Sequence, residues 1–177
     1  MTLEQAIFTI AARSGWTWTA AWWRLGCIIV NASGRSWEAR SPQDTCPKDV
    51  AALGCSGTDC LGRLAWVGWD LDVGHGKAPY RQTEEAIADA RRLRQKLDGR
   101  AEIRRSKSGL GIHVRHMLGD PQETGLQGKD GKAKALELTT GVWIKLDATP
   151  LGRQAFWLWA RKPGERGFEI VEEHRWE

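Results

Sequence analysis

Two aspartates, Asp70 and Asp72, stand one residue apart at the end of an apolar run, in "WVGWDLDV". Side chains alternate between the two faces of a strand, so both carboxylates project from one face, about 6–7 Å apart. Two carboxylates this close repel each other unless a proton or a cation lies between them. Because Mg²⁺ and Mn²⁺ take carboxylate oxygens, the pair predicts a divalent metal site; a solvated strand end is the alternative.

Two later segments place further polar side chains on faces of the same kind. His113 and Arg115 alternate with apolar residues in "GIHVRHML", and Glu137 alternates with two leucines in "ALELTT". Glu137 as a third carboxylate would complete the donor set of two-metal phosphoryl transfer, in which ions about 3.5–4 Å apart bind the attacking and leaving oxygens.

A glycine-containing turn, "SKSGLG", precedes His113. Gly109 and Gly111 allow the backbone to approach a ligand closely, and such turns offer N–H groups to phosphate. With Ser108 in the turn and basic residues beside it, the segment predicts a triphosphate site. The alternative is that His113 is an ordinary surface or core histidine.

The charge is unevenly distributed. The net charge is +4, but basic residues outnumber acids over residues 91–115, and the last stretch, "FEIVEEHRWE", is acidic. Clustered basic charge is typical of a polyanion-binding protein, with a solvated helix face as the alternative. Among the 11 tryptophans, Trp66 falls on the acidic face of its strand and is the candidate for stacking on a base.

Three cysteines, Cys46, Cys55 and Cys60, lie in one loop. Their spacing lacks the paired C-x2-C of common zinc sites, so a zinc clip completed by Cys27 or a distant histidine is one possibility and free thiols are the default. The chain has neither a secretory leader pattern nor an apolar run long enough to span a membrane. We therefore expect a cytoplasmic protein without membrane association.

Periodicity predicts the elements that position these residues. A helix over 1–15 and a largely irregular segment over 32–62 precede a strand–helix–strand unit, with strands over 64–73 and 100–106 around a helix over 83–99. A strand over 111–118 follows, and residues 135–148 are predicted to form a hairpin. The length of 177 residues suits one domain.

In their order and separation, "WDLDVG", "SKSGLGIHV" and "ALELTTGVWIKL" resemble three motifs of the primase-polymerase domains of the archaeo-eukaryotic primase superfamily, particularly those of phages and plasmids. The resemblance covers about residues 64–148. It implies an α/β (α+β) fold in which an RRM-like sheet, residues 63–150, carries the catalytic acids. A smaller N-terminal αβ part, residues 1–62, would form the other side of an active-site cleft, and residues 151–177 would be a C-terminal extension.

The resemblance also implies a role for each matching residue. Asp70, Asp72 and Glu137 would bind Mg²⁺ or Mn²⁺ as a two-metal site, and His113 would complete the catalytic set. The triphosphate of the incoming nucleotide would be held by Ser108, His113, Lys107, Arg104, Gly109 and Gly111. Candidate nucleic-acid contacts are Arg105, Arg115, Lys129 and Lys132. One departure is that relatives carry an arginine in the final hairpin where this chain has Val142, though Lys145 could supply the charge.

The implied function is that of a DNA primase-polymerase, which performs template-directed nucleotidyl transfer for priming and primer extension. Its partners would be a single-stranded DNA template, a primer, ribo- or deoxynucleoside triphosphates and a helicase, supplied in trans or by a longer chain, in a host cell carrying the phage or plasmid. Two other classes remain open. One is a catalytically silent nucleic-acid-binding module for replication initiation, and the other is a metal-dependent glycosyltransferase with a D-x-D motif.

Overall fold

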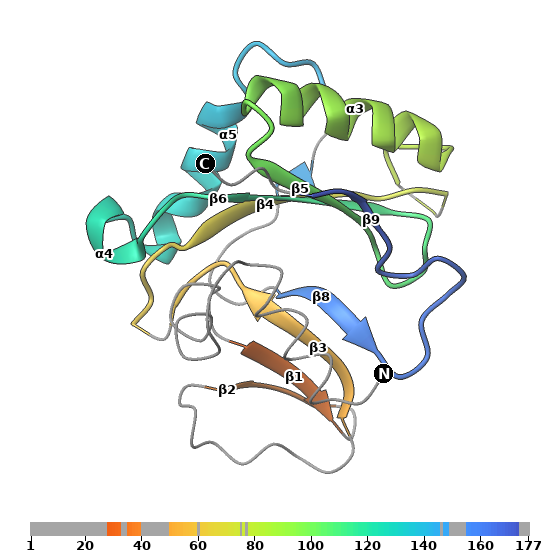
Figure 1. Ribbon diagram of the computed structural model, residues 1–177, viewed down its shortest axis with the longest axis horizontal. Helices are drawn as coiled ribbons and strands as arrows, with labels where there is room; N and C mark the ends of the chain where they lie inside the picture. Colours follow the sequence, from red (N-terminus) through yellow and green to blue (C-terminus); the bar gives the residue numbers. More distant parts are fainter. Residues whose placement is uncertain are drawn as a thin grey trace.

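The computed structural model describes residues 28–32, 35–39, 50–59, 61–74, 76, 78–145, 147–148 and 155–173. Two antiparallel sheets lie one above the other, and helices cover the outer face of one of them (Figure 1). The fold is therefore mixed α/β. None of the helices in these ranges is long and apolar enough to cross a membrane. The helix predicted over 1–15 lies outside the described residues.

The first sheet has the strand order β2-β1-β3-β8. Its strands are β1 (Ile28–Ala32), β2 (Arg35–Ala39), β3 (Val50–Ser56) and β8 (Ala155–Ala160). The predicted irregular segment over 32–62 is thus wrong where β2 and β3 form, and part of the predicted C-terminal extension belongs to this sheet. Gly54 illustrates the reason for the wrong prediction. A Cβ there would lie 2.5 Å from the carbonyl oxygen of Phe156. Although glycine is typical of loops, at this position it permits close pairing of β3 with β8.

The second sheet has the order β7-β4-β6-β5-β9, with all pairs antiparallel. Its strands are β4 (Trp66–Leu71), β5 (Ala101–Arg105), β6 (Ile112–Met117), β7 (Asp147–Ala148) and β9 (Ile170–Glu172). The helical elements along this part of the chain are α3 (Thr83–Lys96), α4 (Pro121–Thr124), the 3-10 turn η1 (Gly128–Asp130) and α5 (Gly131–Thr139). Along the chain, the strands of this sheet and the two helices that cover it come in the order β4-α3-β5-β6-α5-β7. Strand β9 pairs at one edge of the sheet.

Strand β4 separates two cores. Val67, Trp69 and Leu71 belong to the core beneath α3 and α5, whereas Trp66 belongs to a second cluster with Phe156 of β8. This alternation confirms the two-faced strand that the sequence predicts. It also assigns Asp70 to the face directed at the first sheet.

Residues 135–148 do not form the predicted hairpin. Residues 131–139 are helix α5, and only Asp147 and Ala148 form a strand, which pairs with β4. The helix buries Gly131 and Ala135 but leaves Leu136 52% exposed, so its apolar residues do not repeat at the helical period. The alternation of apolar and polar residues in "ALELT" therefore predicted a strand where a helix forms.

Candidate functional site

Asp70 of β4 and His113 of β6 face each other across adjacent strands. They are direct partners in the strand register, and Nε2 of His113 lies 3.5 Å from Oδ1 of Asp70. Directly opposed residues of an antiparallel pair project from the same face. The structure thus brings together two of the predicted catalytic residues, through the alternation that the sequence displays.

The same row of the register extends over the neighbouring strands. Residue 147 of β7 stands opposite Asp70 on one side, and Arg104 of β5 stands opposite His113 on the other. Four polar residues therefore occupy one line across four strands, in the order Asp147, Asp70, His113, Arg104. Sequence analysis gave Asp147 no role, although an acid inside the apolar run "WIKLDA" was a signal that could have identified it.

The His113 imidazole is enclosed. Its side chain is 11% exposed, and its ring stacks on the ring of Phe156 from the first sheet. Burial, reinforced by the nearby Arg104 guanidinium, lowers the pKa of His113 to about 4. In the part of the chain that the structure describes, Nδ1 has no hydrogen-bond partner. With this lowered pKa the ring is neutral at pH 7, and Nδ1 is buried.

Two arginines of this face are occupied within the protein. Nε of Arg104 lies 2.9 Å from one oxygen of Glu102, and Nη2 of Arg115 lies 3.6 Å from the other. Both arginines and Glu102 are buried. Both guanidinium groups are thus paired inside the protein, and the predicted nucleotide contact of Arg104 and nucleic-acid contact of Arg115 stay predictions.

Arg105 is committed in the same way on the other face of β5. Its Nη1 donates a hydrogen bond to the carbonyl oxygen of Gly109 at 2.8 Å, and its Nε lies 3.2 Å from Glu169. Its predicted contact with nucleic acid also stays a prediction.

Cys55 lies against Arg115 in the buried layer between the sheets. An Nη1–H group of Arg115 is directed at the sulfur at 3.5 Å, and burial raises the pKa of the thiol. A protonated thiol beside a positive charge is poorly suited to binding Zn²⁺, which requires the thiolate. Cys27, Cys46 and Cys60 lie outside the described residues, so the predicted zinc clip stays a prediction.

The predicted third carboxylate lies elsewhere. Glu137 is on helix α5, 67% exposed and paired with Lys134 at 2.8 Å, and α5 covers the face of β4 opposite to that of Asp70. The expected set of Asp70, Asp72 and Glu137 is therefore not assembled. Among the described side chains, no group of three acids, histidines or cysteines is placed to hold a metal ion.

The remaining carboxylate donors follow the strand row. Asp72 is partly exposed just beyond β4, in a segment that stays extended to the Val73–Tyr80 bridge, so it continues the face of Asp70. These two carboxylates have the donor chemistry that suits Mg²⁺ or Mn²⁺.

The glycine turn is closed by its own contacts. The N–H of Gly109 donates to the carbonyl oxygen of Ser106 at 3.0 Å, and the N–H of Leu110 donates to Oγ of Ser108 at 3.3 Å. Gly109 has φ +84°, and a Cβ there would collide with the carbonyl oxygen of Glu165. The glycine thus allows close packing against residues 163–168, and its predicted contact with phosphate stays a prediction.

Five further predicted contacts remain predictions. Gly111 is buried, with a hypothetical Cβ 3.1 Å from Oγ of Ser106, while Lys107 and Ser108 are exposed at the turn. Lys129 and Lys132 are exposed on η1 and α5. Because α5 covers the other face of β4, these two lysines belong to the helical side and not to the Asp70 side.

Comparison with known proteins adds no family assignment: no family model matches the sequence, and a search of curated proteins finds no significant match.

Proposed function

We propose that this protein is a metal-dependent nucleotidyltransferase of the primase-polymerase type, acting on a single-stranded DNA template. The chain order β4-α3-β5-β6-α5-β7 and the sheet order β7-β4-β6-β5 support an RRM-like arrangement, since they have the β-α-β-β-α-β connectivity of that class of fold. The acids of the D-x-D motif stand on the sheet face that looks away from the helices, as the proposal requires.

The observation that carries the proposal is the row Asp147, Asp70, His113 across three adjacent strands. We assign the third carboxylate to Asp147, in place of Glu137. A divalent ion held by Asp70, Asp72 and Asp147 would supply charge stabilisation at the α-phosphate and lower the pKa of the attacking 3′-hydroxyl.

The residues around this row have separate tasks. His113, neutral at pH 7, binds a phosphate oxygen through an N–H group and does not act as the base. Asp70 orients the imidazole from the neighbouring strand, 3.5 Å away. Phe156 fixes the plane of the ring by stacking on it.

Primer extension with labelled nucleotides and Mn²⁺ tests the assignment. D70N and D147N should each lower incorporation by about 100-fold or more, because each removes a carboxylate from ions that supply several kcal/mol of transition-state stabilisation. E137Q is the matched control and should stay within about twofold of the unmodified chain, since Glu137 makes only an exposed ion pair.

Two results would contradict the proposal at different levels. Incorporation that survives D70N combined with D72N would refute the metal site. If E137Q lost activity while D147N kept full activity, the proposed reaction would stand. The third metal-binding carboxylate would then be Glu137 and not Asp147.

A second candidate, the catalytically silent nucleic-acid-binding module, is favoured by two features of the same site. Phe156 covers one face of His113, and Arg104 and Arg115 share the Glu102 carboxylate, so these side chains already have partners within the protein. Clear template binding by the unmodified chain without any incorporation, in Mg²⁺ and in Mn²⁺, would establish this candidate and exclude the first.

A further inference from the structure

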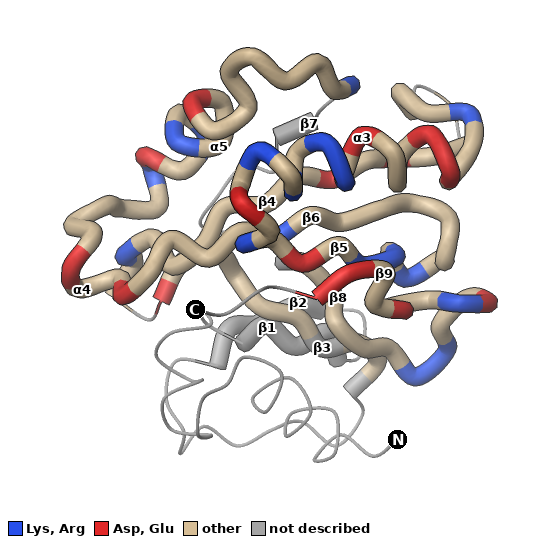
Figure 2. Tube along the Cα trace, turned by 45° about the horizontal axis from the view of Figure 1, so that its top comes forward, with Lys and Arg blue, Asp and Glu red and all other residues tan. Residues whose placement is uncertain are grey.

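The acidic C-terminal strand neutralises one side of helix α3. Nε of Arg91 lies 2.6 Å from one carboxylate oxygen of Glu172 in β9, and Nη1 of Arg94 lies 2.9 Å from the other. The basic cluster over 91–115 is therefore largely paired within the protein. Figure 2 shows the basic segments of α3 and the acidic segment at β9. Two cations of α3, Arg92 and Lys96, make neither of these pairs and border an open pocket.

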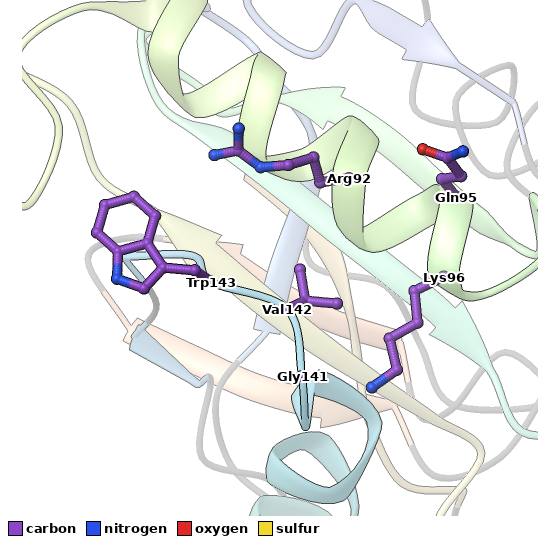
Figure 3. Close-up of a pocket in the computed structure, with 6 residues that line it drawn as sticks. All are labelled: Arg92, Gln95, Lys96, Gly141, Val142 and Trp143. Atoms are coloured by element: carbon purple, nitrogen blue, oxygen red, sulfur yellow. The ribbon is translucent and has the colours of Figure 1, made fainter.

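The pocket has a volume of about 610 Å³ and lies between α3 and the segment that follows α5. One wall is formed by Arg92, Gln95 and Lys96, and the other by Gly141, Val142 and Trp143 (Figure 3). The ammonium group of Lys96 donates a hydrogen bond to the carbonyl oxygen of Thr140, which joins the two walls. The pocket is therefore framed by two ordered elements and not by a single helix face.

Trp143 gives the pocket its distinctive chemistry. Its side chain is 72% exposed, although most other large apolar side chains among the described residues are buried. In Figure 3 the indole and the Arg92 side chain project at the same end of the pocket, while Lys96 stands at the other end. An open indole face beside one cation, with a second cation at the far end of the pocket, can accept a flat ring whose attached groups carry negative charge.

The acidic residue paired with Arg92 does not neutralise the positive charge at the pocket. Asp89 pairs with Arg92, but its carboxylate is buried and also accepts a hydrogen bond from the hydroxyl of Tyr80 at 2.7 Å. The Arg92 side chain remains 52% exposed. The rim of the pocket is thus positive.

We propose that this pocket binds single-stranded nucleic acid, with one base stacked on Trp143 and the flanking phosphates at Arg92 and Lys96. Aromatic stacking combined with a basic groove is the general means of holding single strands without sequence preference. Gln95, with both donor and acceptor groups, can bond the edge of the stacked base. The site lies on the helical side of the second sheet, so it would hold a strand segment away from Asp70 and His113, and it does not depend on the proposed catalysis.

Fluorescence anisotropy of a labelled oligothymidylate, in EDTA and without nucleotide, tests the proposal. W143A should weaken binding at least about fivefold, because stacking on one aromatic side chain contributes that much or more, whereas W143F should keep most of the affinity. R92Q combined with K96Q should reduce the slope of log K against log salt by about 1.4, or about 0.7 for each lost phosphate contact.

Matched controls separate this site from a general surface effect. L136A truncates another exposed apolar residue, 52% exposed on α5, and K162Q removes an exposed cation next to the first sheet; neither should change binding. Because the assay contains EDTA and no nucleotide, it measures no catalysis, so failure of the catalytic proposal leaves this result intact.

Three outcomes would overturn the proposal. W143A could bind as tightly as the unmodified chain, duplex DNA could bind as tightly as the single strand, or thymidine monophosphate could bind the pocket as tightly as the oligonucleotide. The last would show a mononucleotide site in place of a strand-binding site.

Discussion

Phe156 of β8 stacks on His113 of β6, with ring centroids 4.5 Å apart and planes within 8° of parallel. The ring of Trp66 stacks on Phe156 as well, at 5.2 Å. Phe156 thus contacts two strands of the second sheet from the first sheet, and it joins the two layers at the candidate site. The position of the imidazole consequently depends on how the two sheets pack.

Gly68 is the residue of β4 that makes room for this stack. A Cβ at this position would collide with the ring of Phe156 and lie 2.9 Å from Cζ3 of Trp66. We predict that G68A lowers the free energy of unfolding by about 1–3 kcal/mol, as overpacking does elsewhere, measured by urea denaturation. In an F156L background the same change should cost less; equal costs in both backgrounds would contradict the explanation.

The buried imidazole should make stability depend on pH. The folded protein holds His113 neutral down to about pH 4, whereas in the unfolded chain the group takes up a proton below its ordinary pKa of 6.5. Unfolding is therefore linked to proton uptake, and we predict that His113 lowers the free energy of unfolding progressively as the pH falls from about 6.5 to about 4.

Comparison of the unmodified chain with H113F, which keeps an aromatic ring against Phe156, isolates this effect. The residual pH dependence of H113F should be smaller, with His116, whose pKa burial also lowers, as one remaining source. An NMR titration that gives His113 a pKa near 6.5 would refute the prediction.

Arg115 should contribute to stability and not to DNA affinity. R115A leaves Glu102 with one arginine and removes the group that faces Cys55, so we predict a loss of about 3–5 kcal/mol in the free energy of unfolding, the usual cost of breaking a buried ion pair. A variant that removes both charges, R115M with E102Q, should be more stable than R115A. A drop in the salt dependence of DNA binding for R115M with E102Q, provided that it is folded, would instead support the original nucleic-acid contact.

Cys55 should resist alkylation while the protein is folded. It is 1% exposed, and burial raises the pKa of its thiol, so the reactive thiolate is scarce. Iodoacetamide treatment followed by peptide mapping should modify Cys55 only after denaturant is added. Rapid labelling of this position in the native protein would show that the two sheets separate readily.

The sequence predicted the part of the fold with strong periodicity. Strands β4, β5 and β6 and helix α3 were predicted from alternation and from the stripe that Ala86, Ala90 and Leu93 form. Helix α5 was mistaken for a strand because it is short and buries few residues. Strands β2 and β3 were missed because strand pairing, and not local preference, determines the structure there.

The candidate site was predicted in part for a related reason. The opposition of Asp70 and His113 follows from alternation on two strands, which is a local property. The burial of Arg104 and the pairing of Arg91 with Glu172, 81 residues away, depend on contacts between distant segments. Clustered basic residues therefore suggested a broader binding surface than the folded chain presents.

The Glu172 carboxylate pairs with both Arg91 and Arg94, and so occupies two guanidinium groups that could otherwise bind phosphate. A chain shortened to end before β9 would release these two guanidinium groups and uncover an edge of the sheet. During purification such a shortened protein would carry host RNA and DNA with it, visible as a raised ratio of absorbance at 260 nm to that at 280 nm.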